Sequence, residues 1–293
     1  MATSETSRMS DLGPLTGIVA AMEEEVSDLR ARMIGARAVA VAGAHVTMGW
    51  IGAARVALAV TGDGERNARR GLSALLASHP IDRLLVVGVA GGLSSDLDVG
   101  ALVAADSVIN EADGDVRPAD AALVITAASA CGARRGVAVT ASRIADTADD
   151  KRRLLAVALA ARGESTRVAG GGGPLAAVVD LESAGFAAIA GQAGVPWLIL
   201  RAVSDTAADS IPPLLNRSRD DGGAVQRGRV AWGLLTNPRA LLPLLALRER
   251  VRACARHLAR AVERTVSVLH AADDFSLRAT MAADGKEKNI DGA

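Results

Sequence analysis

Carboxylates and glycines gather in this sequence at five places where an apolar segment ends. In chain order these places are Glu23-Glu24-Glu25, Gly62-Asp63-Gly64, Gly88-Val89-Ala90-Gly91-Gly92, Asp180-Leu181-Glu182 and Ser204-Asp205. Carboxylates transfer protons and stabilise positive charge, and the backbone amides of glycine-rich turns bind anions. In open α/β sheets the carboxyl ends of the strands form the ligand site. The spacing therefore predicts one site that is assembled from separated segments.

Each of these residues also has an ordinary structural explanation. A glutamate such as Glu25 in a first helical turn is favoured by the helix dipole. Glu182 can simply begin a helix, and Asp205 can cap one or close a turn. The loop around Gly62 and Gly64 gives only an incomplete dinucleotide fingerprint, because Asn67 stands where a third glycine is expected. The functional interpretation therefore depends on the joint pattern.

That joint pattern resembles a known superfamily. The segments AMEEEV, VGVAGGL, VVDLES and RAVSD occur in the order and approximate spacing of the nucleoside phosphorylases and nucleosidases, and most resemble the methylthioadenosine/S-adenosylhomocysteine nucleosidases. This resemblance covers roughly residues 15–208. A second resemblance, carried by SDTAADSIPPLL and the segment 232–263, is to the hopanoid-associated branch, which is linked to removal of adenine from adenosylhopane.

The resemblance implies cleavage of the bond between a ribose and a purine. This reaction builds positive charge on the sugar and negative charge on the base, so it needs an acid on one side and a nucleophile on the other. Asp205 matches the residue that protonates the purine, and Ser204 the residue that orients it. Glu182 matches the residue that binds the ribose hydroxyls. Glu25 matches the base that activates an attacking water.

The same resemblance implies the rest of the pocket and shows three departures. Further substrate contacts are expected from Leu181, Ala90, Gly91, Gly92 and Ile144, and a site for water or phosphate from Gly62, Gly64 and Val89. Val89 replaces a Ser or Thr, Val86 replaces a phosphate-binding Arg, and Ile144 falls near a base-stacking Phe. Phosphate is best bound by a forked Arg, for which Arg66 is a candidate. These departures favour water as the nucleophile and leave phosphate as the alternative.

The elements that must position these residues alternate between strands and helices. We expect an α/β fold, a three-layer α/β/α arrangement around a central mixed sheet, with a C-terminal helical extension. The expected boundaries are a disordered leader over 1–14, a single domain over 15–271 and a disordered tail over 272–293. Expected strands are Leu15–Met22, Ala36–Trp50, Ile51–Val60, Asp82–Leu93, Val99–Ile109, Arg135–Thr140 and Val195–Asp205, with a strand-to-helix segment at Ala176–Gly194 and helices at Ala68–Ser78, Asp149–Ala161 and Arg227–Leu269.

Composition limits the classes of partner. The formal net charge is zero, which argues against nucleic-acid binding. Neither the two cysteines nor the four histidines are spaced as metal ligands. We expect no cofactor and no metal, a cytoplasmic location, and a homo-oligomer, as is usual for the proteins that the chain resembles.

The C-terminal segment bears on the substrate. Five leucines between Leu241 and Leu247 precede a run of arginines, so the helix could cover a channel for a lipid-linked nucleoside, touch a membrane surface, or pack on its own domain. The alternatives are a methylthioadenosine-type nucleosidase or purine phosphorylase with a small substrate, and a nucleoside-binding protein that lacks catalysis.

Overall fold

The computed structural model describes residues 13–165, 174–218 and 241–287, with side chains to residue 163 of the first range and to residue 276 of the last. A large mixed sheet runs through the molecule in the strand order β10-β6-β8-β9-β5-β1-β4-β3-β2. The strands are β1 (Leu15–Ala20), β2 (Ile34–Val41), β3 (Ala44–Ile51), β4 (Ala54–Val60), β5 (Arg83–Gly92), β6 (Leu102–Asn110), β7 (Val116–Pro118), β8 (Arg134–Thr140), β9 (Ala176–Asp180) and β10 (Trp197–Asp205). The predicted α/β class with a central mixed sheet is confirmed.

The sheet closes on itself at one end. Strand β10 pairs with β6 and also runs parallel to β5, from Trp197 beside Leu84 to Asp205 beside Gly91. Strands β10, β6, β8, β9 and β5 therefore form a ring. The β10–β5 register shifts between Val203 and Asp205, and such an irregularity bends a strand and re-aims its side chains. The acidic end of β10 thereby lies beside the glycine-rich end of β5.

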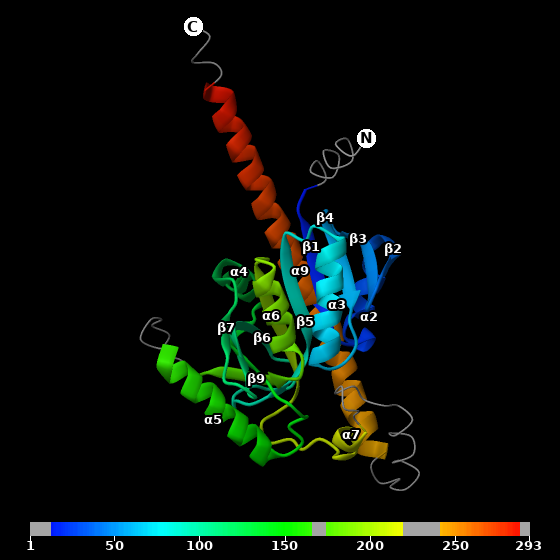
Figure 1. Ribbon diagram of the computed structural model, residues 1–293, viewed down its shortest axis with the longest axis vertical. Coiled ribbons are helices and arrows are strands. Elements are labelled where there is room, and N and C mark those ends of the chain that lie inside the picture. Colours follow the sequence, from blue (N-terminus) through cyan, green and yellow to red (C-terminus); the bar gives the residue numbers. More distant parts are fainter. Residues whose placement is uncertain (1–12, 166–173, 219–240, 288–293) are drawn as a thin grey trace.

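Helices cover the sheet on both faces (Figure 1). One apolar core lies between the sheet and α2, α4 and α9; a second lies beneath α3 and α6; a third joins α5 to β8 and β9. The bounds are α2 (Glu23–Ala31), α3 (Glu65–Ser78), α4 (Ala121–Cys131), α5 (Ala148–Ser165), α6 (Ser183–Gln192), α7 (Leu214–Arg217) and α9 (Leu241–Glu287). Strands that are buried on both faces explain the uninterrupted apolar runs of the sequence.

One predicted element was wrong, and one helix was not predicted. The run predicted as one strand over Ala36–Trp50 is a hairpin, because Gly43 adopts φ +85° between β2 and β3. Helix α4 was missed altogether. Its ends carry ordinary signals, since the Asp120 side chain accepts a hydrogen bond from the Leu123 amide and Gly132 adopts a left-handed conformation. The turn predicted at Gly52 is confirmed, with φ +58°.

The last helix is longer than the sequence pattern indicated. Helix α9 spans 47 residues, and Pro243 is accommodated because it lies in the first helical turn. The helix continues to Glu287, beyond the expected domain end at Ala271, and its C-terminal half projects away from the sheet (Figure 1). The predicted leader and the start of the C-terminal segment fall largely on residues 1–12 and 219–240, outside the described residues. Within the described residues, no helix has the length and apolar character needed to cross a membrane.

Candidate active site

An open cavity of about 1460 Å³ lies at the carboxyl ends of β1, β4, β5 and β10. It collects nearly all of the residues that the sequence pattern singled out. Those lining it are Glu25, Gly62, Val89, Ala90, Gly91, Ile144, Leu181, Glu182, Ser204 and Asp205. Gly64 and Gly92 lie behind this lining, Gly64 with its amide on Glu182 and Gly92 against Val203 and the backbone of Asp205. The motifs that are separated in sequence therefore meet around one space.

Glu25 is a buried carboxylate that is held at both oxygens. One oxygen accepts a hydrogen bond from the Met22 amide and the other from the Val89 amide, each at 2.9 Å. Val89 thus contributes its backbone, although its side chain lacks the expected hydroxyl. Burial raises the pKa of Glu25, and the nearby charge of Arg201 opposes this shift. Such a group takes up a proton more readily than an exposed glutamate does, which suits a base.

Arg201 is the most important site residue that the sequence analysis missed. It is only 2% exposed, donates from Nε to Asp180 at 2.9 Å and from Nη2 to Ser183 Oγ at 2.9 Å. The sequence signal was available, because Arg201 is the single charged residue within the apolar run WLILRAV. A buried charge requires a partner, and here the guanidinium anchors a cluster of three carboxylates that includes Glu25 and Glu182.

Gly88 makes this cluster sterically feasible. A Cβ atom at Gly88 would lie 2.2 Å from Arg201 Nη1 and 2.5 Å from Glu25 Oε1. The guanidinium and the carboxylate therefore both pack over the bare backbone of β5. Gly91 has the same function for Asp205, whose Oδ2 would lie 3.1 Å from an added Cβ. Gly88 is therefore required for space, and Gly91 allows close packing of Asp205.

Glu182 lies at the wall of the cavity, between β9 and α6. Its Oε1 accepts a hydrogen bond from the Gly64 amide at 2.9 Å. Burial, with added repulsion from Asp180 and Glu25, raises the pKa of Glu182 to about 7. The raised pKa shows that Glu182 lies in a buried, negatively charged environment. A positive charge that develops on a bound sugar would be stabilised by this environment.

Asp205 is buried at the end of β10, and both of its oxygens accept hydrogen bonds. Ser204 Oγ donates to Oδ1 at 2.6 Å, and Lys151 Nζ donates to Oδ2 at 2.5 Å. The contact with Ser204 agrees with the orienting role predicted for that residue. Lys151 was not identified from the sequence as a site residue, because it lies on α5, far from every motif.

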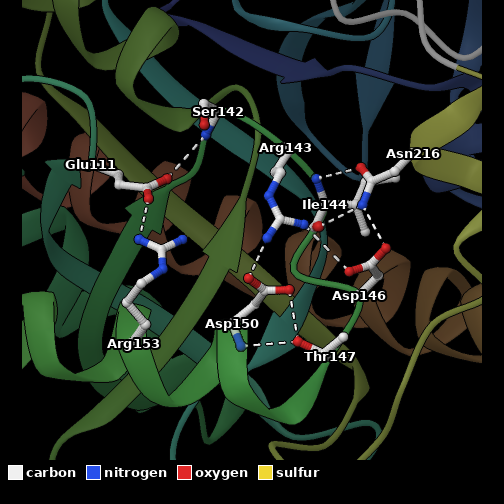
Figure 2. Close-up of polar contacts among 9 residues, drawn as sticks. All are labelled: Glu111, Ser142, Arg143, Ile144, Asp146, Thr147, Asp150, Arg153 and Asn216. Atoms are coloured by element: carbon white, nitrogen blue, oxygen red, sulfur yellow. Dashed lines mark hydrogen bonds and ion pairs between the residues drawn. The ribbon is translucent and has the colours of Figure 1, made fainter.

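A polar network fixes the loop that carries Ile144 into the cavity (Figure 2). Asn216 of α7 accepts from the Ile144 amide at 3.0 Å and donates to the Ile144 carbonyl at 2.9 Å and to Asp146 at 2.8 Å. At the start of α5, Thr147 Oγ1 accepts from the Asp150 amide at 3.1 Å and donates to its carboxylate at 2.7 Å. The aliphatic face of Ile144 is thereby held at the cavity wall, where the superfamily pattern led us to expect a stacking Phe.

The residues weighed for phosphate binding do not converge on Glu25. Val86 is fully buried in β5, and Arg66 is exposed on α3 and does not line the cavity. The Arg201 guanidinium, whose charge acts on Glu25, is bound to Asp180. Among the residues that the structure describes, no group of three or more His, Cys, Asp or Glu side chains is arranged to hold a metal ion.

Part of the cavity lining is aliphatic, although Arg70 and Arg248 also line the cavity. The first turns of α9 contribute Leu244, Leu247 and Val251, and β2 contributes Val39 and Val41. The cavity exceeds the roughly 300–1,000 Å³ of an ordinary small-molecule site. It therefore has room beyond a nucleoside for an apolar group.

Comparisons with known proteins agree with this geometry. Residues 16–226 match the family described as the phosphorylase superfamily. A 5′-methylthioadenosine/S-adenosylhomocysteine nucleosidase of Geobacillus kaustophilus is 32% identical over 212 residues, which cover 66% of this chain and 84% of that protein.

Solved structures show the same fold. The S-adenosylhomocysteine nucleosidase of Streptococcus pyogenes, in complex with 5-methylthiotubericidin, matches with a TM-score of 0.66 and 19% identity over 87% of this chain and 96% of that one. The futalosine hydrolase of Helicobacter pylori matches with a TM-score of 0.65 and 15% identity over 87% and 97%. The motifs, the cavity and these matches together show that the chain is an enzyme that belongs to the phosphorylase superfamily.

Proposed function

We propose that this protein hydrolyses the N-glycosidic bond of an adenine nucleoside that carries a substituent at its 5′ position, of the methylthioadenosine and S-adenosylhomocysteine class. One observation supports this most strongly: Glu25, Glu182 and Asp205 line the same cavity in a member of the superfamily. The curated relatives, named as nucleosidases for those two compounds, support the choice of substrate class.

In the proposed reaction, each carboxylate has a separate task. Asp205 delivers a proton to N7 of the departing adenine, and Ser204 keeps the carboxyl group aligned. Glu182 binds the ribose hydroxyls and stabilises the positive charge that develops on the sugar. Glu25, held by the Met22 and Val89 amides, takes a proton from water as it attacks the sugar carbon.

Water is favoured over phosphate because the nucleophile side of the cavity is negatively charged. Phosphate beside Glu25 and Glu182 would be repelled by both carboxylates, and the guanidinium within that cluster, Arg201, already binds Asp180. The test is release of adenine from methylthioadenosine with and without inorganic phosphate. Equal rates and free methylthioribose support hydrolysis. Strict dependence on phosphate and a sugar-1-phosphate product would overturn it.

The variant Asp205→Asn tests the alternative that the protein binds nucleosides without catalysis. Loss of a positioned general acid lowers turnover by about 10²–10⁴-fold, whereas the amide keeps the shape and one hydrogen-bond acceptor of the carboxyl group. An enzyme therefore loses turnover while its affinity for a methylthioadenosine analogue changes little. A wild-type protein that binds the analogue but releases no adenine from any nucleoside would instead identify a binder.

The aliphatic part of the lining favours a second candidate substrate, an adenosine linked through C5′ to a large lipid such as a hopanoid. Leu244, Leu247 and Val251 offer the hydrophobic surface that such a group needs. Substitution of Leu244 and Leu247 by Ser should then raise KM for adenosylhopane far more than KM for methylthioadenosine. An equal effect on both substrates, or no release of adenine from adenosylhopane by the wild type, would limit the enzyme to small substrates.

A further inference from the structure

Lys151 is an unusual residue in this chain. Lysine occurs only at positions 151, 286 and 288, although Lys and Arg together number 33. Arginine therefore serves nearly every other cationic position. Lys151 is also only 1% exposed, and a buried ammonium is costly unless it is fully paired. A local reason must favour a compact ammonium group at this one position.

The surroundings of Lys151 supply that reason. Its ammonium group has three donors, and each has an acceptor: Asp205 Oδ2 at 2.5 Å, the Thr206 carbonyl at 2.5 Å and the Asp209 carbonyl at 3.1 Å. These acceptors belong to the end of β10 and the turn that follows. The planar fork of an arginine could not place three donors in this compact arrangement. Helix α5, capped by Thr147, carries Lys151 to this point.

The pair lies beside the cavity where the base would depart. Asp205 lines the cavity, whereas Lys151 lies behind it and does not. Both oxygens of Asp205 accept hydrogen bonds, one from Ser204 and one from Lys151. The Lys151 ammonium group is therefore separated from the cavity by the Asp205 carboxyl group. Lys151 can act on a bound purine only through Asp205.

We propose that Lys151 is a positioning residue for the leaving base: it holds the Asp205 carboxylate toward the purine and supplies the proton that Asp205 passes on. This inference rests on the proposed function. As the bond between C1′ and N9 breaks, its electron pair goes to the base; the Lys151 ammonium transfers a proton to the Asp205 carboxylate, and Asp205 passes a proton to N7. Water adds to C1′ and loses a proton to Glu25. Exchange with solvent then returns that proton to Lys151.

The test compares two leaving groups in the same full-length enzyme. Methylthioadenosine needs protonation of its base, whereas 4-nitrophenyl 5-methylthioriboside releases a phenolate that departs without a proton. Lys151→Met should lower kcat for methylthioadenosine by about 10²-fold or more, and change kcat for the nitrophenyl glycoside by less than about threefold. An equal loss on both would reduce Lys151 to a structural residue. If the wild type cleaves neither, the proposed function itself fails.

Two further variants separate the parts of the proposal. Lys151→Gln keeps a hydrogen-bond donor but carries no proton to transfer, so it should be as slow on methylthioadenosine as Lys151→Met. Full activity in Lys151→Gln would show that the residue only holds Asp205 in place, and would overturn proton supply.

The double variant Asp205→Asn/Lys151→Met decides the matter if Lys151→Met does not fold or the glycoside is not turned over. Asparagine at 205 removes the charge that loss of Lys151 would leave unpaired. The double variant should release adenine at the rate of Asp205→Asn alone, because Lys151 acts only through Asp205. A further loss in the double variant would contradict the proposal.

Discussion

The Glu182 carboxylate accepts a hydrogen bond at 2.9 Å from the backbone amide of Gly64, which adopts φ +85° at the start of α3. This hydrogen bond links the β9–α6 segment to the β4–α3 loop. It does not fully compensate for burial and for the neighbouring charges of Asp180 and Glu25, because the pKa of Glu182 is still raised to about 7.

This raised pKa predicts a specific pH dependence of stability. Between the ordinary value of 4.5 and about 7, Glu182 binds more protons in the folded protein than in the unfolded chain. Its contribution to the free energy of unfolding therefore falls as pH rises through this window. The contribution of Glu182 is at most roughly 3 kcal/mol, reduced by the water that reaches the open cavity.

Glu182→Gln should remove this contribution. Urea unfolding at pH 5 and pH 8 should show the variant gaining stability relative to the wild type at the higher pH. Glu263→Gln, which alters a carboxylate that is 42% exposed on α9, is the control and should leave the wild-type pH dependence unchanged. Parallel pH curves for Glu182→Gln and the wild type would contradict the assignment of the raised pKa to Glu182.

We expect kcat/KM to decrease at low pH for a related reason. Burial raises the pKa of Glu25, and that of Glu182 is about 7. The proposed mechanism needs both carboxylates ionised in the free enzyme, so kcat/KM should fall as pH decreases below about 7. The profile is measured with methylthioadenosine over pH 5 to 9. A rate that stays constant down to pH 5 would show that neither raised pKa controls the chemistry.

Most of the site was visible in the sequence because parallel strands end at a common edge. Glu25 follows β1 and Asp205 ends β10, and both strands run parallel to β5. Glu182 follows β9, which meets the end of β5 in antiparallel pairing, so its place beside the other two depends on the closure of the sheet. The β2–β3 hairpin was missed because its turn depends on Gly43 alone. Helix α4 was missed although Asp120 and Gly132 mark its ends.

Arg201 and Lys151 were harder to predict for a physical reason. Each is a buried cation whose place is justified only by a partner distant in sequence: Asp180 lies 21 residues from Arg201, and Asp205 lies 54 residues from Lys151. Local sequence patterns predict the strand or helix to which a residue belongs. They do not predict its contact partner in the folded protein. The anomalies of an Arg in an apolar strand and a lone Lys among arginines were the available signals.

The clamp between Asn216 and Ile144 should affect substrate binding more than chemistry. Asn216 holds both the amide and the carbonyl of Ile144, and neither group belongs to the carboxylate cluster. Asn216→Ala frees the loop, so part of the binding energy is spent on reordering it. We expect KM for methylthioadenosine to rise by about tenfold while kcat changes by less than threefold. A loss confined to kcat would show that the loop acts in the chemical step.

Gly88→Ala should disable the site without altering any polar group. The added methyl would lie 2.2 Å from Arg201 Nη1 and 2.5 Å from Glu25 Oε1, so at least one of these side chains must move. A displacement of about 1 Å at a catalytic group costs about 10²-fold in rate, and we expect a loss of that size in kcat/KM.

Gly191→Ala is the matched control, because Gly191 lies exposed in α6 and an added Cβ would meet no neighbouring element within 4 Å. That variant should keep full activity and gain roughly 0.5–1 kcal/mol of stability. Wild-type activity in Gly88→Ala would show that Glu25 and Arg201 do not need their observed positions over β5.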